Sequence, residues 1–253
     1  MANNESWKKI FEFNNILEHD FNNGPYYLNA KAHIKPAVKG MDKTTETEVR
    51  ILCKMDTRED VPEIMQHNGL FLLPVKNGTY ALVKGEGYLD IPDITENALD
   101  YESKLDFELQ SSTIGNSEMQ HLDFAYASSL VRTFIDDPSL VLAIRGRKYT
   151  PEFHFFVNKQ RIEVKGVQTE VDAGYEGKDK IVLIEAKNSS TKNTIIRQLY
   201  YPYRQWSQNI DKDVLLVFFE KRRDEYLLWE FTFTDKFDYN SVKLSKCKKY
   251  RIV

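Results

Sequence analysis

The chain has 253 residues, 42% of them hydrophobic and 13% aromatic, so it can bury the core of one large domain or two small ones. Its net charge of −3 excludes the bulk basicity of a protein that coats nucleic acid passively. The apolar runs have only the length of strands, and the polar residues 1–9 lack the core of a signal peptide, so we expect no membrane association. Cys53 and Cys247 are far apart and lack metal-ligand spacing, which predicts reduced thiols in a cytoplasmic protein. The five histidines form no pair with zinc-site spacing, so we expect no zinc site.

The first 110 residues predict a small α+β domain. Apolar residues near helical spacing predict a helix over 5–19, and Asp60 has the features of an N-cap for a second, short helix. Asn77-Gly78 lies between two apolar runs and predicts a hairpin over 70–83 with a type I′ turn. Short helices before a hairpin resemble a winged helix, a module that reads DNA. Residues 85–110 hold eight acidic residues and one basic residue, which is typical of a boundary or a solvated linker.

Residues 111–253 predict a larger α/β domain. Ser117 and Gln120 begin a helix over 117–136, and a second helix is expected over 194–208, with Pro202 as a kink or break. Between and after these helices, apolar runs predict a series of strands, at 140–145, 152–157, 160–172, 181–187, 214–219 and 226–233. The sequence therefore predicts an α/β fold for this domain, preceded by the smaller N-terminal domain.

Two carboxylates and one lysine stand near the ends of two predicted strands. Residues 181–184 are apolar at every position, which predicts a strand buried on both faces. Side chains alternate along a strand, so Glu185 and Lys187 share one face while Ala186 points to the other. Asp172 lies at the end of the preceding strand, beyond which residues 173–178 read as a turn. Charged groups at the end of a buried strand need a partner, and two carboxylates suit a hard divalent cation.

The alternative is an ordinary surface ion pair, because Glu-x-Lys is a common triplet and most instances are solvated. A buried apolar strand immediately before Glu185, and Asp172 at the end of its predicted neighbour, favour a functional site.

Asp172, twelve residues, and then Glu185-Ala186-Lys187 resemble the motif of the PD-(D/E)xK nucleases, with Val171 in place of the usual proline. The resemblance covers residues 111–210, and the size of the chain makes it most similar to a type II restriction endonuclease. It implies a mixed sheet flanked by helices, and magnesium, with manganese tolerated, on Asp172, Glu185 and the carbonyl of Ala186. It places Lys187 beside the attacking water. It also implies supporting roles for an acidic residue on the helix before the sheet, Glu118 with Asp123 as the second choice, and for Gln198 on the helix after the motif.

The resulting expectation is a sequence-specific endonuclease that cuts double-stranded DNA as a homodimer in a restriction-modification system, with a cognate DNA methyltransferase. Residues 1–110 would recognise DNA and residues 111–253 would cut it. Two alternatives stay open: a repair or recombination nuclease with the same motif, and a catalytically inactive DNA-binding regulator.

Overall fold

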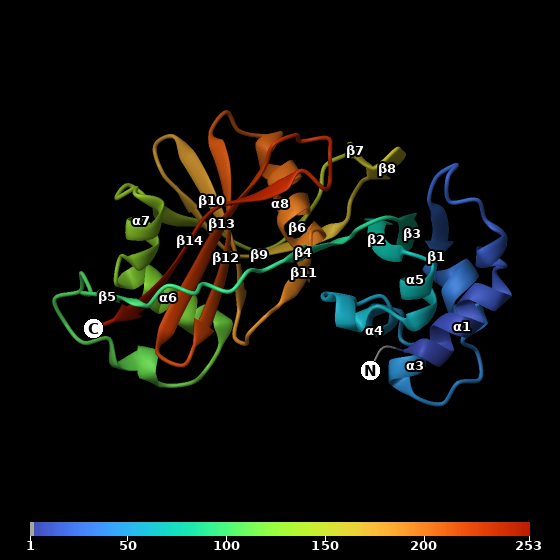
Figure 1. The fold of residues 1–253 in the computed structure, drawn as a ribbon, viewed down its shortest axis with the longest axis horizontal. Helices are drawn as coiled ribbons and strands as arrows, with labels where there is room; N and C mark the ends of the chain where they lie inside the picture. The colour runs from blue at the N-terminus through green and yellow to red at the C-terminus, as the bar shows by residue number, and fades with distance from the viewer. Residues whose placement is uncertain (1–2) are drawn as a thin grey trace.

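The computed structural model describes residues 3–253, which form two lobes side by side along the long axis of the molecule (Figure 1). The N-terminal lobe, residues 3–84, packs short helices against a small antiparallel sheet with the strand order β1-β3-β2. Its helices are α1 (Asn4–Phe13), α2 (Lys35–Ala37), α3 (Thr44–Thr47), α4 (Val49–Leu52) and α5 (Glu63–His67). Its strands are β1 (Tyr26–Asn29), β2 (Leu70–Lys76) and β3 (Thr79–Lys84). Short 3-10 turns (Ile16–Glu18, Arg58–Asp60) and a π-helical turn (Ala30–Ile34) connect them.

The larger lobe, residues 85–253, is built on a seven-stranded mixed sheet with the order β5-β14-β13-β12-β10-β9-β6. Its strands are β5 (Leu99–Tyr101), β6 (Val141–Tyr149), β9 (Gln168–Glu176), β10 (Lys180–Lys187), β12 (Asp213–Arg222), β13 (Glu225–Phe233) and β14 (Val242–Ile252). β6, β9 and β10 are antiparallel neighbours, whereas β10 and β12 are parallel. Parallel neighbours need a crossover, and α8 (Arg197–Ser207) provides it.

Helices cover both faces of this sheet. On one face, α6 (Glu118–Ala127) and α7 (Leu130–Ile135) pack against Val182 and Ile184 of β10 and against residues of β12. On the other face, Leu199 of α8 packs against Ile181 and Leu183. Because β10 is covered on both sides, it is apolar at every position from 181 to 184, as the sequence predicts for a fully buried strand.

A second hairpin, β7 (Phe153–Val157) with β8 (Gln160–Val164), leaves the main sheet and joins the core of the N-terminal lobe. Phe155 is fully buried there and stacks on Tyr239 at 5.3 Å between ring centroids. The two lobes therefore share one hydrophobic core, built from segments far apart in the sequence.

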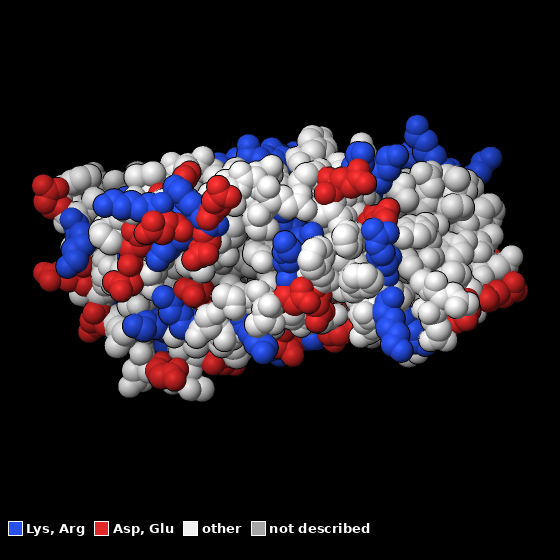
Figure 2. Space-filling view, turned by 90° about the horizontal axis from the view of Figure 1, so that it is seen from above, with Lys and Arg blue, Asp and Glu red and all other residues white. Residues whose placement is uncertain are grey.

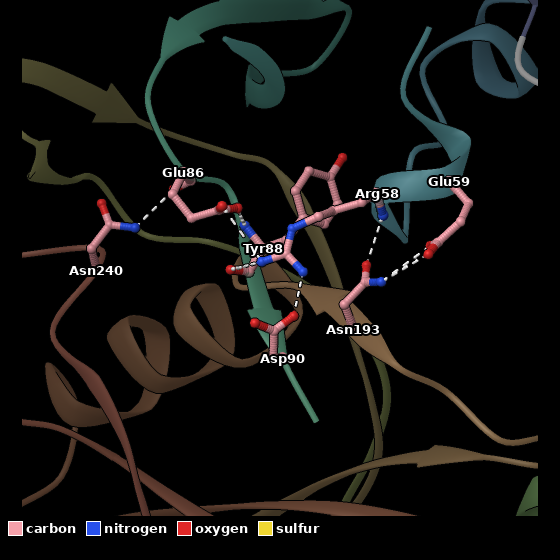
Figure 3. Close-up of polar contacts among 7 residues, drawn as sticks. All are labelled: Arg58, Glu59, Glu86, Tyr88, Asp90, Asn193 and Asn240. Atoms are coloured by element: carbon pink, nitrogen blue, oxygen red, sulfur yellow. Dashed lines mark hydrogen bonds and ion pairs between the residues drawn. The ribbon is translucent and has the colours of Figure 1, made fainter. Parts of the chain in front are cut away.

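Polar contacts also join the lobes, at a two-stranded sheet of β4 (Tyr88–Asp90) and β11 (Asn193–Ile195) (Figure 3). Arg58 forms an ion pair with Asp90 of β4, and its backbone N–H donates to the side chain of Asn193 at 2.7 Å. The amide of Asn193 donates to both carboxylate oxygens of Glu59, at 3.1 and 3.2 Å. The segment that follows the Glu-x-Lys triplet is thus held by the N-terminal lobe.

The α/β class, the mixed sheet and the smaller N-terminal region with helices and a sheet are confirmed. The hairpin over 70–83 is also confirmed, although its turn is not type I′, because only Gly78 of the two turn residues has a positive φ, of 70°. The helix expected over 5–19 ends earlier, at Phe13. The acidic stretch 85–110 is no solvated linker, because β4 pairs with β11, β5 pairs with β14, and Ile91 is buried.

Two other long elements are each divided in two. The predicted helix over 117–136 forms α6 and α7, because Ser129 adopts a left-handed φ of 67°. The predicted strand over 160–172 is interrupted at Gly166, with φ +64°, and then continues as β9 as far as Glu176. Asp172 therefore lies within a strand and not at its end. Among residues 3–253, no helix is long and apolar enough to cross a membrane.

Candidate functional site

The position of Asp172 is set by an irregularity in β9. Between the pairs Ile144–Gly174 and Gly146–Val171, β9 advances by three residues where β6 advances by two, so β9 holds one extra residue at this point. Such a bulge bends the strand and re-aims its side chains. Glycine is needed at position 174, because a Cβ there would lie 2.6 Å from the Cβ of Ile144. Regular pairing of β9 with β10 ends at Ala173 and Ile184.

Beyond that point the side chain of Asp172 connects β9 to β10. Its Oδ2 accepts a hydrogen bond of 2.7 Å from the backbone N–H of Ala186. This bond fixes the carboxylate of β9 beside the Glu185-Ala186-Lys187 triplet of β10. The three charged residues that the sequence singles out are therefore brought together.

Glu185 and Lys187 share a face, as strand alternation predicts, and their side chains form an ion pair with an Nζ–Oε1 distance of 2.5 Å. Their side chains are only 12% and 23% exposed, so water screens this pair weakly. Burial, only partly offset by the ammonium of Lys187, raises the pKa of Glu185 to about 7. Burial also raises the pKa of Asp172. Burial disfavours the charged form of Lys187, but the carboxylate of Glu185 outweighs this and raises its pKa.

These residues line a cavity of about 260 Å³ between β9, β10 and the start of α8. Glu118 and Gln198 line the same cavity, so the side chains predicted to form the site all reach one place; they are Asp172, Glu185, Lys187, Glu118 and Gln198. Glu118 accepts a hydrogen bond of 3.1 Å from the N–H of Asn188, and Gln198 accepts one of 2.5 Å from the hydroxyl of Thr194. Asp123, the second choice, does not line the cavity and forms an ion pair with Arg145.

The sequence reasoning missed two residues of this region. Glu220 lies beside Lys187 on the parallel strand β12, is fully buried, and accepts a hydrogen bond of 2.7 Å from the N–H of Thr191. It therefore fixes the loop after Lys187, and its only sequence signal is a carboxylate directly after an apolar strand. Arg197, next to Gln198, also lines the cavity, and its buried Nε has no hydrogen-bond partner.

The donor set suits a hard divalent cation. In Asp172 and in Glu185, one carboxylate oxygen takes part in a hydrogen bond or ion pair, and the second oxygen could bind a cation. Burial penalises the negative charge of both carboxylates. A cation beside them would reverse that penalty, because opposite charge favours the ionised form. Across residues 3–253, no three His, Cys, Asp or Glu side chains form a metal-binding group, so the carbonyl of Ala186 and water would complete the set.

Because the charge of Glu185 is buried, removing this charge should increase the free energy of unfolding of the protein. Its pKa is about 7 in the folded state and about 4.3 when unfolded, so the folded state binds more protons between these values and stability falls as pH rises through them. In chelator, Glu185→Gln should match the wild type near pH 4 and exceed it near pH 8 by on the order of 3 kcal/mol, or roughly 9 °C. Thermal unfolding at both pH values is the measurement.

A matched control is Glu176→Gln at the far end of β9, where the carboxylate is 40% exposed and pairs with Lys212. It should show no comparable gain at the higher pH. A Glu185→Gln protein whose advantage over the wild type is the same at both pH values would contradict the burial argument.

The comparisons with known proteins divide the chain at the end of the N-terminal lobe. Residues 4–82 match a family described as Domain of unknown function (DUF6996), and residues 83–251 match Domain of unknown function (DUF6997). No curated protein and no solved structure matches the chain. The second match covers more than half of the 253 residues and includes the whole cavity lining described above, so the chain belongs to the DUF6997 family.

Proposed function

We propose that this protein is a divalent-metal-dependent endonuclease that hydrolyses phosphodiester bonds of double-stranded DNA, of the type II restriction kind. The observation that carries the proposal is the hydrogen bond from the Ala186 N–H to Asp172, which places both carboxylates beside Lys187 in one cavity. The mixed sheet with helices on both faces agrees with the restriction-endonuclease-like fold that the motif implies. In a restriction-modification system a cognate DNA methyltransferase would protect the cell's own DNA, and the enzyme would act in the cytoplasm.

The residues of the cavity would have different roles in the reaction. Asp172, Glu185 and the carbonyl of Ala186 would hold magnesium or manganese, for which oxygen donors are suited. Bound there, the ion would offset charge on the scissile phosphate and lower the pKa of a water molecule. Lys187 is an ammonium donor held by Glu185, so it would orient the water or stabilise charge that develops on the phosphate. Glu118 and Gln198 support the site, through the N–H of Asn188 and the hydroxyl of Thr194.

Target recognition is assigned to the N-terminal lobe. Its short helices precede the β2-β3 hairpin, the order that resembles a winged helix, and β1 adds a third strand to that hairpin. The lobe is joined to the segment between Lys187 and α8 through Arg58, Glu59 and Asn193. The lobe to which recognition is assigned therefore holds the residues that follow Glu185-Ala186-Lys187.

The test of the proposed function is incubation of the full chain with plasmid DNA and magnesium. Discrete fragments would support a sequence-specific enzyme. A smear would favour a nonspecific nuclease with the same chemistry, and binding without cleavage would favour an inactive regulator. Intact plasmid, with neither binding nor cleavage in magnesium or manganese, would overturn the proposal.

We expect the active species to be a symmetric homodimer. The chain holds one motif and hence one site, and two sites related by a two-fold axis are the simplest way to cut both strands of a palindrome. Light scattering on protein bound to its target in calcium should give about twice the 29.6 kDa of one chain, plus the DNA. A single chain per target that cuts both strands in one encounter would contradict this expectation.

A further inference from the structure

A second, larger cavity lies between the two lobes and adjoins the cavity lined by Asp172, Glu185 and Lys187, which we call the catalytic cavity. Its volume is about 550 Å³, and Gln168 and Arg197 line both cavities, so these two residues lie at the boundary between them. One wall comes from the N-terminal lobe, from the end of α4 and from strands β2 and β3. The opposite wall comes from the end of β6, the start of β9 and β11 of the larger lobe. We call this cavity the interlobe groove.

The two cavities have opposite charge. The catalytic cavity is lined by four carboxylates and two cations, which suits a metal ion. The interlobe groove is lined by four cations and one carboxylate, that of Asp56; the cations are Arg50, Lys54, Lys76 and Arg197. Asp56 offsets this charge only weakly, because its ion pairs with Lys54 and Arg197 are long, at 3.6 and 3.8 Å.

The cations of the groove are available to a ligand. Arg50, Lys54 and Lys76 are exposed, and they come from two segments of the N-terminal lobe, the end of α4 and strand β2. On the face that Figure 2 shows, Lys and Arg are interspersed with Asp and Glu over the larger lobe. Residues 145–148 of β6 are also basic, but Arg145 pairs with Asp123 and Arg147 with Glu170.

We propose that the interlobe groove binds the phosphodiester backbone of the DNA on one side of the scissile phosphate. This inference rests on the proposed function, because it takes the catalytic cavity as the position of the phosphate that is cut. A polyanion with one phosphate at the metal site places its next phosphates along the adjoining surface, and here that surface is basic. Arg197 lies at the junction, where its Nε is buried without a hydrogen-bond partner. The groove fixes register and orientation, as phosphate contacts do, and base readout is left to other residues.

The experiment measures binding of a labelled DNA duplex to the full chain in chelator, which separates binding from cleavage, over a series of salt concentrations. Removing one cation that neutralises a phosphate should reduce the slope of log K against log salt by about 0.9. Arg50→Ala, Lys54→Ala and Lys76→Ala should each reduce the slope by roughly one, and the triple variant by roughly three, with unchanged melting temperature. Lys9→Ala is the matched control, because Lys9 is an exposed residue of α1 that does not line the groove.

The possible outcomes distinguish failure of this inference from failure of the proposed function. If the wild type cuts plasmid DNA and the folded triple variant keeps the wild-type slope and affinity, the groove assignment is wrong while the nuclease proposal stands. If the wild type neither binds nor cuts DNA, both are overturned. A reduced slope in the triple variant, with the Lys9→Ala slope unchanged, supports the groove even if the rate of cleavage proves low.

Discussion

Asp172→Asn, Glu185→Ala and Lys187→Ala should each lower the rate of DNA cleavage by about three orders of magnitude or more. Asp172 and Glu185 would supply the side-chain oxygens of the proposed metal site, and an amide is a weaker ligand for a hard cation than a carboxylate. Lys187 is the ammonium closest to these oxygens, 2.5 Å from Glu185. Plasmid nicking rates in magnesium measure the effect, and DNA binding in calcium shows whether the variants still recognise the substrate.

The same Glu176→Gln control distinguishes loss of chemistry from loss of fold. Glu176 lies on the same strand as Asp172 but does not line the cavity, and therefore its variant should cut at nearly the wild-type rate. The three site variants should keep the wild-type circular dichroism spectrum and a cooperative unfolding transition. Near-wild-type cutting by Glu185→Ala or Lys187→Ala would remove the basis of the catalytic assignment.

Removal of divalent cations should abolish cleavage, and magnesium or manganese should restore it. The donor set contains carboxylate and carbonyl oxygens and neither histidine nor cysteine, so it favours these hard ions over zinc. The nuclease resemblance implies that calcium binds without supporting cleavage. Cleavage rates over a metal titration, after dialysis against chelator, are the first measurement.

Thermal unfolding gives a readout that is independent of activity. Burial penalises the charges of Asp172 and Glu185, so cation binding should raise the melting temperature of the wild type above pH 7. The Glu185→Ala protein should lose most of this gain because it lacks one of the two carboxylates. Full cleavage in excess chelator, or an equal cation-dependent shift in both proteins, would contradict the metal assignment.

The local parts of the site were predictable from the order of the residues alone. Alternation along a strand requires Glu185 and Lys187 to share a face, and the all-apolar residues 181–184 identify a strand buried on both sides. The turn chemistry of Asn77-Gly78 likewise determined the hairpin of the N-terminal lobe, although not its turn type. These features depend on neighbours within a few residues, which is the range over which sequence patterns carry information.

The way in which distant segments meet depends on the folded arrangement of the whole chain. The bulge in β9 depends on its register with β6, and the bond between Asp172 and Ala186 depends on where pairing of β9 with β10 ends. Glu118 reaches the site through a contact with Asn188, 70 residues away in sequence. The basic groove needs Arg50 and Lys76 from one lobe to face Arg197 from the other. No periodicity encodes such pairings, because they follow from packing the shared core of the two lobes and from satisfying its buried polar groups.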